Sequence, residues 1–98
     1  MRSVTPREFA ELEDAALIDV REPAELAEVR TEQGIPIPMS TFLDHLDELP
    51  DGPIYLLCHS GARSARVAAY LEQQGREAIN IDGGIVEWEA QGLPVIRG

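Results

Sequence analysis

The sequence has one cysteine, no lysine and no long apolar run. One cysteine excludes an internal disulfide, and with only two histidines, His45 and His59, it leaves too few ligands for a zinc cluster. The apolar stretches, such as 54–58, are far shorter than the ~20 residues that a membrane helix needs, and the first residues lack the apolar core of a signal peptide. We therefore expect a cytoplasmic protein with no metal and no other cofactor.

Positive charge is also scarce, since eight arginines face 18 acidic residues and the net charge is −10. This charge repels phosphate backbones and anionic lipid, so we expect no nucleic-acid partner and no membrane partner. Acidic residues are absent from 52–71, the window that contains Cys58, His59, Arg63 and Arg66. The pattern predicts a region of positive potential, and Arg66 either widens this region or pairs with a carboxylate. The alternative explanation is burial, because a buried strand and helix would also exclude carboxylates.

At 98 residues the chain has room for one domain around one core, and we assign residues 1–98 to it. Short apolar runs predict strands at 15–20, 54–58 and 77–81 and a weak edge strand at 34–39. Caps, first-turn prolines and apolar spacing predict helices at 6–13, 23–30, 41–49 (capped by Ser40), 63–74 and 83–92. The alternation predicts a compact α/β domain with a mostly parallel, roughly five-stranded sheet covered on both faces.

The single cysteine, Cys58, ends an apolar strand and precedes a tight turn that leads into a helix near Arg63. Ligands bind at this edge of parallel sheets, and Gly61 lets the backbone approach a ligand closely. Amide groups of such a turn, the helix N-terminus and the Arg63 guanidinium would favour the ionised sulfur. We expect Cys58 to be a thiolate at neutral pH; the alternative is a small apolar residue that completes the strand.

The remaining residues of the turn are candidates for substrate binding. Ser60 and Ser64 offer hydroxyl donors to an anion, although serine is also common in turns and caps. His59 either lines the mouth of the pocket or is an exposed turn residue. The predicted substrate-binding residues are therefore His59, Ser60, Gly61, Ala62 and Ser64. The predicted catalytic residues are Cys58 and Arg63. Trp88 is expected to pack in the core.

Three segments resemble the rhodanese-like sulfurtransferase family in its single-domain form: "LIDVREPAE" at 17–25, "CHSGARSARVAAYL" at 58–71 and "INIDGGIVEWEAQGLPV" at 79–95. The resemblance implies a three-layer α/β/α sandwich around a five-stranded parallel sheet. It also implies that Cys58 carries sulfur and that 58–63 forms the active-site loop. Two features depart from the family's pattern: "VRTEQGIPIP" at 29–38, which reshapes one pocket wall, and His59, where members often have arginine.

The mechanism that the resemblance implies is a double displacement. A small anionic sulfane-sulfur donor such as thiosulfate passes one sulfur to Cys58, and a thiol or cyanide-like acceptor removes it. One cysteine suffices for this, whereas a reductase with an internal disulfide needs two. The acidic surface could also receive a protein sulfur acceptor, or it could simply be solvated.

Two other functions remain open. A cysteine phosphatase or arsenate reductase of the related cell-cycle phosphatase type has a similar loop, but with one residue more than the six from Cys58 to Arg63. A non-catalytic rhodanese-like module that binds a partner or senses oxidants would share the fold without the activity.

Overall fold

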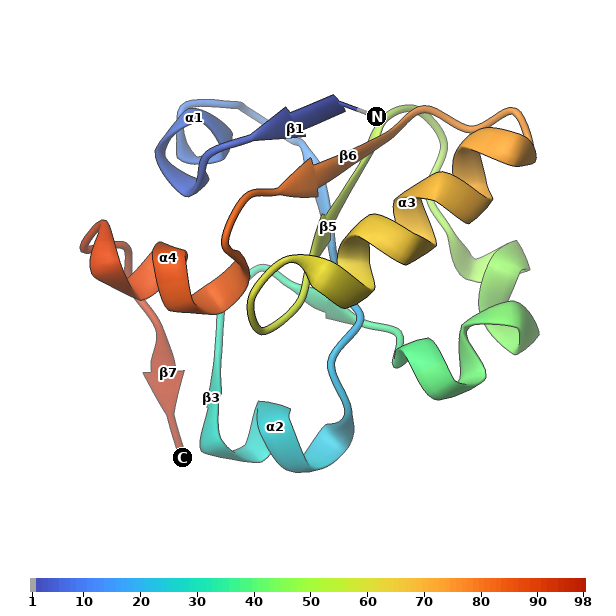
Figure 1. Cartoon of the computed structure of the whole chain (residues 1–98). Helices are drawn as coiled ribbons and strands as arrows, with labels where there is room; N and C mark the ends of the chain where they lie inside the picture. Colours follow the sequence, from blue (N-terminus) through green and yellow to red (C-terminus); the bar gives the residue numbers. More distant parts are fainter. Residues whose placement is uncertain (1) are drawn as a thin grey trace.

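Five parallel strands form the main sheet of the computed structural model, which describes residues 2–98. The strand order is β1-β6-β5-β2-β4, and every neighbouring pair is parallel. The strands are β1 (Arg2–Val4), β2 (Ala16–Asp19), β4 (Ile35–Pro36), β5 (Ile54–Leu57) and β6 (Ala78–Ile81). The predicted fold class, a five-stranded parallel sheet between helices, is therefore confirmed (Figure 1).

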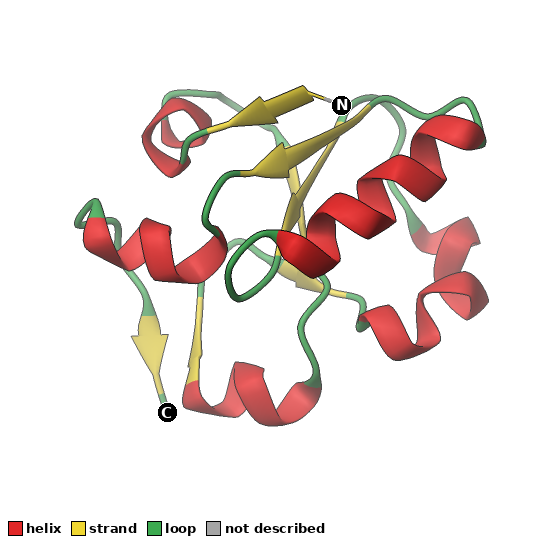
Figure 2. Ribbon diagram, in the orientation of Figure 1, coloured by secondary structure: helices red, strands yellow, loops and turns green. Residues whose placement is uncertain are grey.

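Helices cover both faces of this sheet (Figure 2). Side chains of a strand alternate between faces, so Ile54 and Leu56 of β5 pack on one side while Tyr55 and Leu57 pack on the other. The first side is covered by α3 (Ala62–Gln73) and the 3-10 helix η1 (Met39–Glu48), and the second by α1 (Pro6–Ala10) and α4 (Gly84–Ala90). Alternation also places Cys58 on the α3 side, because it follows Leu56 by two residues.

The predicted helix at 41–49 is wrong in type, because the structure has 3-10 turns interrupted at Thr41 and His45. These two residues have φ near −120°, outside the helical region. The segment is rich in Ser, Thr, Asp and His, which are weak helix formers. Ser40 does not cap it, since Pro38 occupies that position and the Ser40 hydroxyl donates to a carboxylate oxygen of Glu22 at 2.7 Å.

Three further helices are shorter than predicted, and the last of them, predicted at 83–92, is α4 (Gly84–Ala90). The first ends at Ala10, as α1, and the second is α2 (Pro23–Glu28). Residues Val29–Arg30 instead form strand β3, which pairs antiparallel with β7 (Ile96–Arg97). The sequence analysis missed β1, β3 and β7, because two- and three-residue strands carry too few residues for a periodic signal.

The predicted core role of Trp88 is confirmed, since it is fully buried with Phe9 and Leu57 on the α4 side. Its indole N–H donates to the Pro94 carbonyl at 3.0 Å. None of the helices within residues 2–98 combines the length and the apolar character required to cross a bilayer.

Candidate active site

The sulfur of Cys58 lies directly beyond the carboxyl end of β5, at the start of the turn into α3. The residue is only 1% exposed and packs with the core cluster of the α3 side. Its burial fits the expectation of an apolar residue that completes the strand, and its place at the turn fits the expectation of a reactive thiol. Its carbon atoms complete the core, while its sulfur belongs to the turn.

Hydrogen-bond donors surround this sulfur. The backbone N–H of Gly61 donates to Sγ at 3.0 Å, and the Ser64 hydroxyl lies 3.3 Å from it. Burial is the largest single influence on the Cys58 thiol and raises its pKa. Hydrogen bonds from Ser64 and from the amides of Gly61 and Ser60 lower the pKa, and together they outweigh the effect of burial. The net pKa lies below that of a free thiol, in the direction that the sequence analysis predicted.

The conformation of the turn depends on glycines in two segments. Gly61 has φ +104°, a left-handed conformation that presents its N–H to the sulfur. Gly84, at the start of α4, has φ +58°, and a Cβ there would lie 2.4 Å from the Cys58 carbonyl oxygen. This close approach lets the Ile85 amide donate to the same oxygen at 2.8 Å. The "DGG" of the third motif therefore holds the turn against α4.

Ser64 approaches the sulfur from the buried side of the turn. It is fully buried, and its single hydroxyl proton has three acceptors nearby: the sulfur, the Gly61 carbonyl at 3.2 Å and Asn80 Oδ1 at 2.5 Å. Asn80 Nδ2 also donates to the Gly61 carbonyl at 3.3 Å. The sequence analysis missed Asn80, although a lone polar residue in the buried strand β6 was a signal for it.

The other predicted binding residues lie on the outer side of the turn. His59, Ser60 and Ala62 are all exposed. The main chain of Ser60 helps to lower the pKa of Cys58, and the His59 carbonyl accepts the Val86 amide at 3.2 Å. The turn thus brings the predicted set together, with main-chain groups facing the sulfur and the side chains of His59 and Ser60 in solvent.

Arg63 occupies the first turn of α3, but its guanidinium is already paired. Its two terminal nitrogens donate to the two carboxylate oxygens of Glu25 at 2.6 and 2.7 Å. This pair lowers the pKa of Glu25 from 4.5 to about 2 and raises that of Arg63. The predicted region of positive potential is therefore partly neutralised by α2. The sequence analysis missed Glu25, because no local pattern links residues 38 positions apart.

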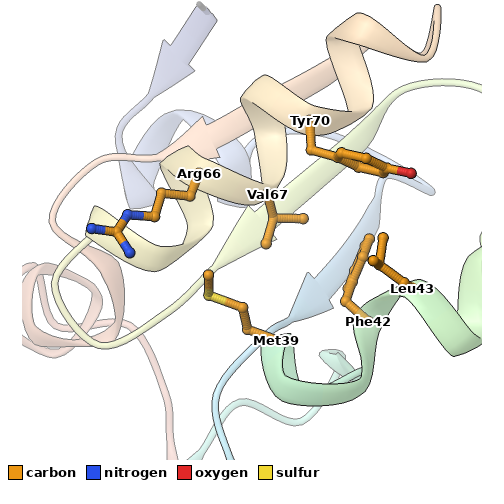
Figure 3. A pocket seen from close by; sticks show the side chains of 6 residues that line it. All are labelled: Met39, Phe42, Leu43, Arg66, Val67 and Tyr70. Atoms are coloured by element: carbon orange, nitrogen blue, oxygen red, sulfur yellow. The ribbon is translucent and has the colours of Figure 1, made fainter.

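Arg66 lies one turn further along α3 and makes no ion pair with any residue in the range 2–98 that the structure describes. Of the two expectations for it, the wider positive field is the one that agrees with this position. Its side chain is exposed at one end of an apolar cavity of about 220 Å³ between α3 and η1 (Figure 3). The cavity is lined by Met39, Phe42, Leu43, Arg66, Val67 and Tyr70.

The sequence model of the family described as the rhodanese-like domain matches residues 5–91 of the chain. The chain belongs to the rhodanese-like family. A sulfurtransferase of Allochromatium vinosum is 39% identical over 90 residues, which cover 90% of this chain and 84% of that protein. The thiosulfate sulfurtransferase GlpE of Glaesserella parasuis is 30% identical, over 97% of this chain and 93% of its own. The crystal structure of a rhodanese-related protein from Thermoplasma volcanium has a TM-score of 0.90 at 31% identity and covers 98% of both chains.

This rhodanese-like chain therefore combines the family fold with a single cysteine, Cys58, buried at the end of a central strand. The three motifs of the sequence analysis meet at one end of the sheet. The first supplies Glu25, the second supplies the turn from Cys58 to Arg63, and the third supplies Asn80 and Gly84.

Proposed function

We propose that this protein is a sulfurtransferase that moves sulfane sulfur from a small anionic donor such as thiosulfate to a nucleophilic acceptor through a persulfide on Cys58. One observation carries the proposal: the only thiol lies where main-chain and hydroxyl donors favour its ionised form. The thiolate is the nucleophilic form of cysteine. Relatives named sulfurtransferases, which align along most of the chain, add support.

The first half-reaction needs only the thiolate and the donor. The Cys58 thiolate attacks the outer sulfur of thiosulfate, a new S–S bond forms, the S–S bond of thiosulfate breaks, and sulfite leaves with the electron pair. Cys58 then carries a persulfide anion. The Gly61 amide and the Ser64 hydroxyl contact Sγ, so they stabilise the negative charge of the thiolate before the new bond forms.

The second half-reaction restores the enzyme. A thiol or cyanide acceptor attacks the outer persulfide sulfur, the S–S bond breaks, and Cys58 leaves as a thiolate that the same donors stabilise. With cyanide the product is thiocyanate. The low pKa of Cys58 favours this step too, because a thiolate of lower pKa is a better leaving group.

Arg63 is proposed to attract the anionic donor to the turn. It lies in the first turn of the helix that follows Cys58, and the nearby Cys58 charge is one of the influences that raise its pKa, after Glu25. Its bonds to Glu25 use one N–H on each terminal nitrogen and leave the Nε–H and a second N–H on each for a ligand.

The proposal is tested by thiocyanate formation from thiosulfate and cyanide, with wild type and Cys58→Ser compared. We expect turnover by the wild type and a loss of at least about 10³-fold in the variant, because serine has no thiolate at neutral pH. Matching circular dichroism spectra would show that the variant folds. Equal rates, or no transfer by the wild type from thiosulfate or from a persulfide, would contradict the proposal. Reversible oxidation of Cys58 without transfer would favour the redox-sensing module instead.

A further inference from the structure

The carboxylate of Glu25 is bound on two sides, by Arg63 and by its own helix. Besides the bidentate contact with Arg63, its Oε1 accepts the Glu22 amide at 3.0 Å at the N-terminus of α2. The side chains of Glu25 and Arg63 are 31% and 32% exposed, so the pair lies at the surface of the molecule. Glu25 is thus fixed in place and is not a mobile surface carboxylate.

This arrangement has a consequence for any anion that approaches Arg63. Planar, bidentate binding of a carboxylate uses the same terminal N–H groups that best bind an oxyanion such as thiosulfate. A donor must therefore use the remaining N–H groups or displace Glu25. It also meets the negative charge of Glu25 itself, which repels a dianion more than a monoanion.

We propose that Glu25 is a specificity-determining residue, which lowers the affinity of the site for donors of high negative charge by occupying Arg63. The inference rests on the proposed function and extends it to the class of donor. Sulfur donors with one negative charge or none, such as alkyl persulfides without carboxylates, are favoured relative to the thiosulfate dianion.

The chemistry with such a donor balances without another reactant. The Cys58 thiolate attacks the outer sulfur of the protonated persulfide, the donor S–S bond breaks, and the departing thiolate takes up the proton of the persulfide to become a thiol. Cys58 carries the same persulfide as it would after reaction with thiosulfate. No product of this step bears the two charges of sulfite.

Glu25 exerts this influence throughout the working pH range. Its pKa lies at about 2, held down mainly by Arg63, so the carboxylate is ionised at any pH at which the Cys58 thiol is reactive. Changes of pH around neutrality do not alter the charge of Glu25. The residue therefore acts as a fixed filter for donor charge and not as a pH switch.

Alkylation of Cys58 tests the inference without any need for sulfur transfer. The reagents are iodoacetate, an anion, and iodoacetamide, its neutral analogue. The measured quantity is the rate of alkylation by iodoacetate divided by the rate of alkylation by iodoacetamide. The thiolate fraction and any opening of the buried site cancel in this ratio, because both reagents require them equally. We expect Glu25→Gln to raise the ratio about fivefold at low salt, and less at high salt.

The matched control is Glu77→Gln. Glu77 also pairs with an arginine, Arg2, at 2.9 Å, and it precedes β6, at the opposite end of the strands from Cys58. The substitution removes the same charge at a greater distance from Cys58, where Coulomb repulsion is weaker, so we expect a ratio within about 1.5-fold of wild type. Glu25→Asp, which keeps the charge, should restore most of the wild-type ratio.

Steady-state kinetics then address the donors. In Glu25→Gln we expect KM for thiosulfate to fall about fivefold, while KM for an uncharged alkyl persulfide changes less than twofold. An unchanged alkylation ratio in a folded, active Glu25→Gln variant would overturn the inference alone. Absence of transfer in every variant together with the expected ratio would overturn the proposed function and leave the charge filter standing.

Discussion

Two carboxylate–guanidinium pairs include residues of the segment 19–25, and they differ in their burial and in the number of their partners. Asp19 and Arg21 are each 1% exposed, and Arg21 also donates to the Val29 carbonyl at 2.8 Å and to the Glu25 carbonyl at 3.4 Å. Glu25 and Arg63 are about one-third exposed and join segments 38 residues apart.

The difference separates a structural pair from a functional one. The protein uses donors on all three nitrogens of the Arg21 guanidinium, through Asp19 and two main-chain carbonyls, so the pair fixes the course of the chain from β2 through α2 to β3. Arg63 keeps donors free beside the cysteine turn. Burial and the number of partners, and not the residue types, thus distinguish the two roles.

The largest expected effect is on stability and comes from the buried pair. Asp19→Asn removes the charge that compensates Arg21 inside the protein, so we expect the free energy of unfolding to fall by about 3–5 kcal/mol. Urea denaturation of wild type and variant measures this change. A loss below about 1 kcal/mol would mean that the two pairs are energetically alike and would break the comparison.

The next effect is on catalysis and comes from the exposed pair. Arg63→Ala should raise KM for thiosulfate about tenfold, because a hydrogen bond to a charged group contributes ~1.5–3 kcal/mol and Glu25 already takes part of it. The free energy of unfolding should change by less than about 1 kcal/mol. Unchanged KM and kcat would remove Arg63 from its assigned role.

The double variant Arg63→Ala/Glu25→Gln sharpens this result. Arg63→Ala alone leaves the Glu25 carboxylate without its partner beside the turn, where it repels an anionic donor. We therefore expect KM of the double variant to lie between those of Arg63→Ala and wild type. A KM above that of Arg63→Ala would contradict a repulsive role for Glu25.

The smallest effect is the contribution of Glu25 to acid stability. Its pKa is lowered from 4.5 to about 2, so its stabilisation is present above about pH 4.5 and is lost as the pH falls towards about 2. Wild type should lose more stability over this range than Glu25→Gln, by less than about 1 kcal/mol because the pair is partly exposed to solvent. Thermal denaturation at several pH values measures the difference, and parallel curves would contradict it.

The sequence predicted those parts of the site that are local along the chain. The apolar run before Cys58, the glycine after it and the helix that starts at Ala62 are neighbours in sequence, so turn geometry and helix signals were enough. Fold class followed from the alternation of strands and helices for the same reason. The motif that contains Gly84 was found by resemblance, and its reason became visible only in the contact with the Cys58 carbonyl.

Contacts between distant segments were not predictable in this way. The pairing of Glu25 with Arg63 depends on how α2 packs beside the start of α3, which no spacing rule encodes. The two-residue strands β3 and β7 depend on tertiary packing more than on propensity. The predicted region of positive potential was therefore overestimated, because charge counted along the sequence ignores a carboxylate that folding brings in.

The most direct test of the account is the intact mass of the protein after exposure to thiosulfate and removal of excess reagent. We predict that the wild type gains the mass of one sulfur atom, that peptide mapping locates it on Cys58, and that cyanide or a reducing thiol removes it. Cys58→Ser should gain nothing. An unmodified wild type, or sulfur bound equally to the Cys58→Ser variant, would contradict the central claim that the donors around Cys58 prepare it to carry sulfur.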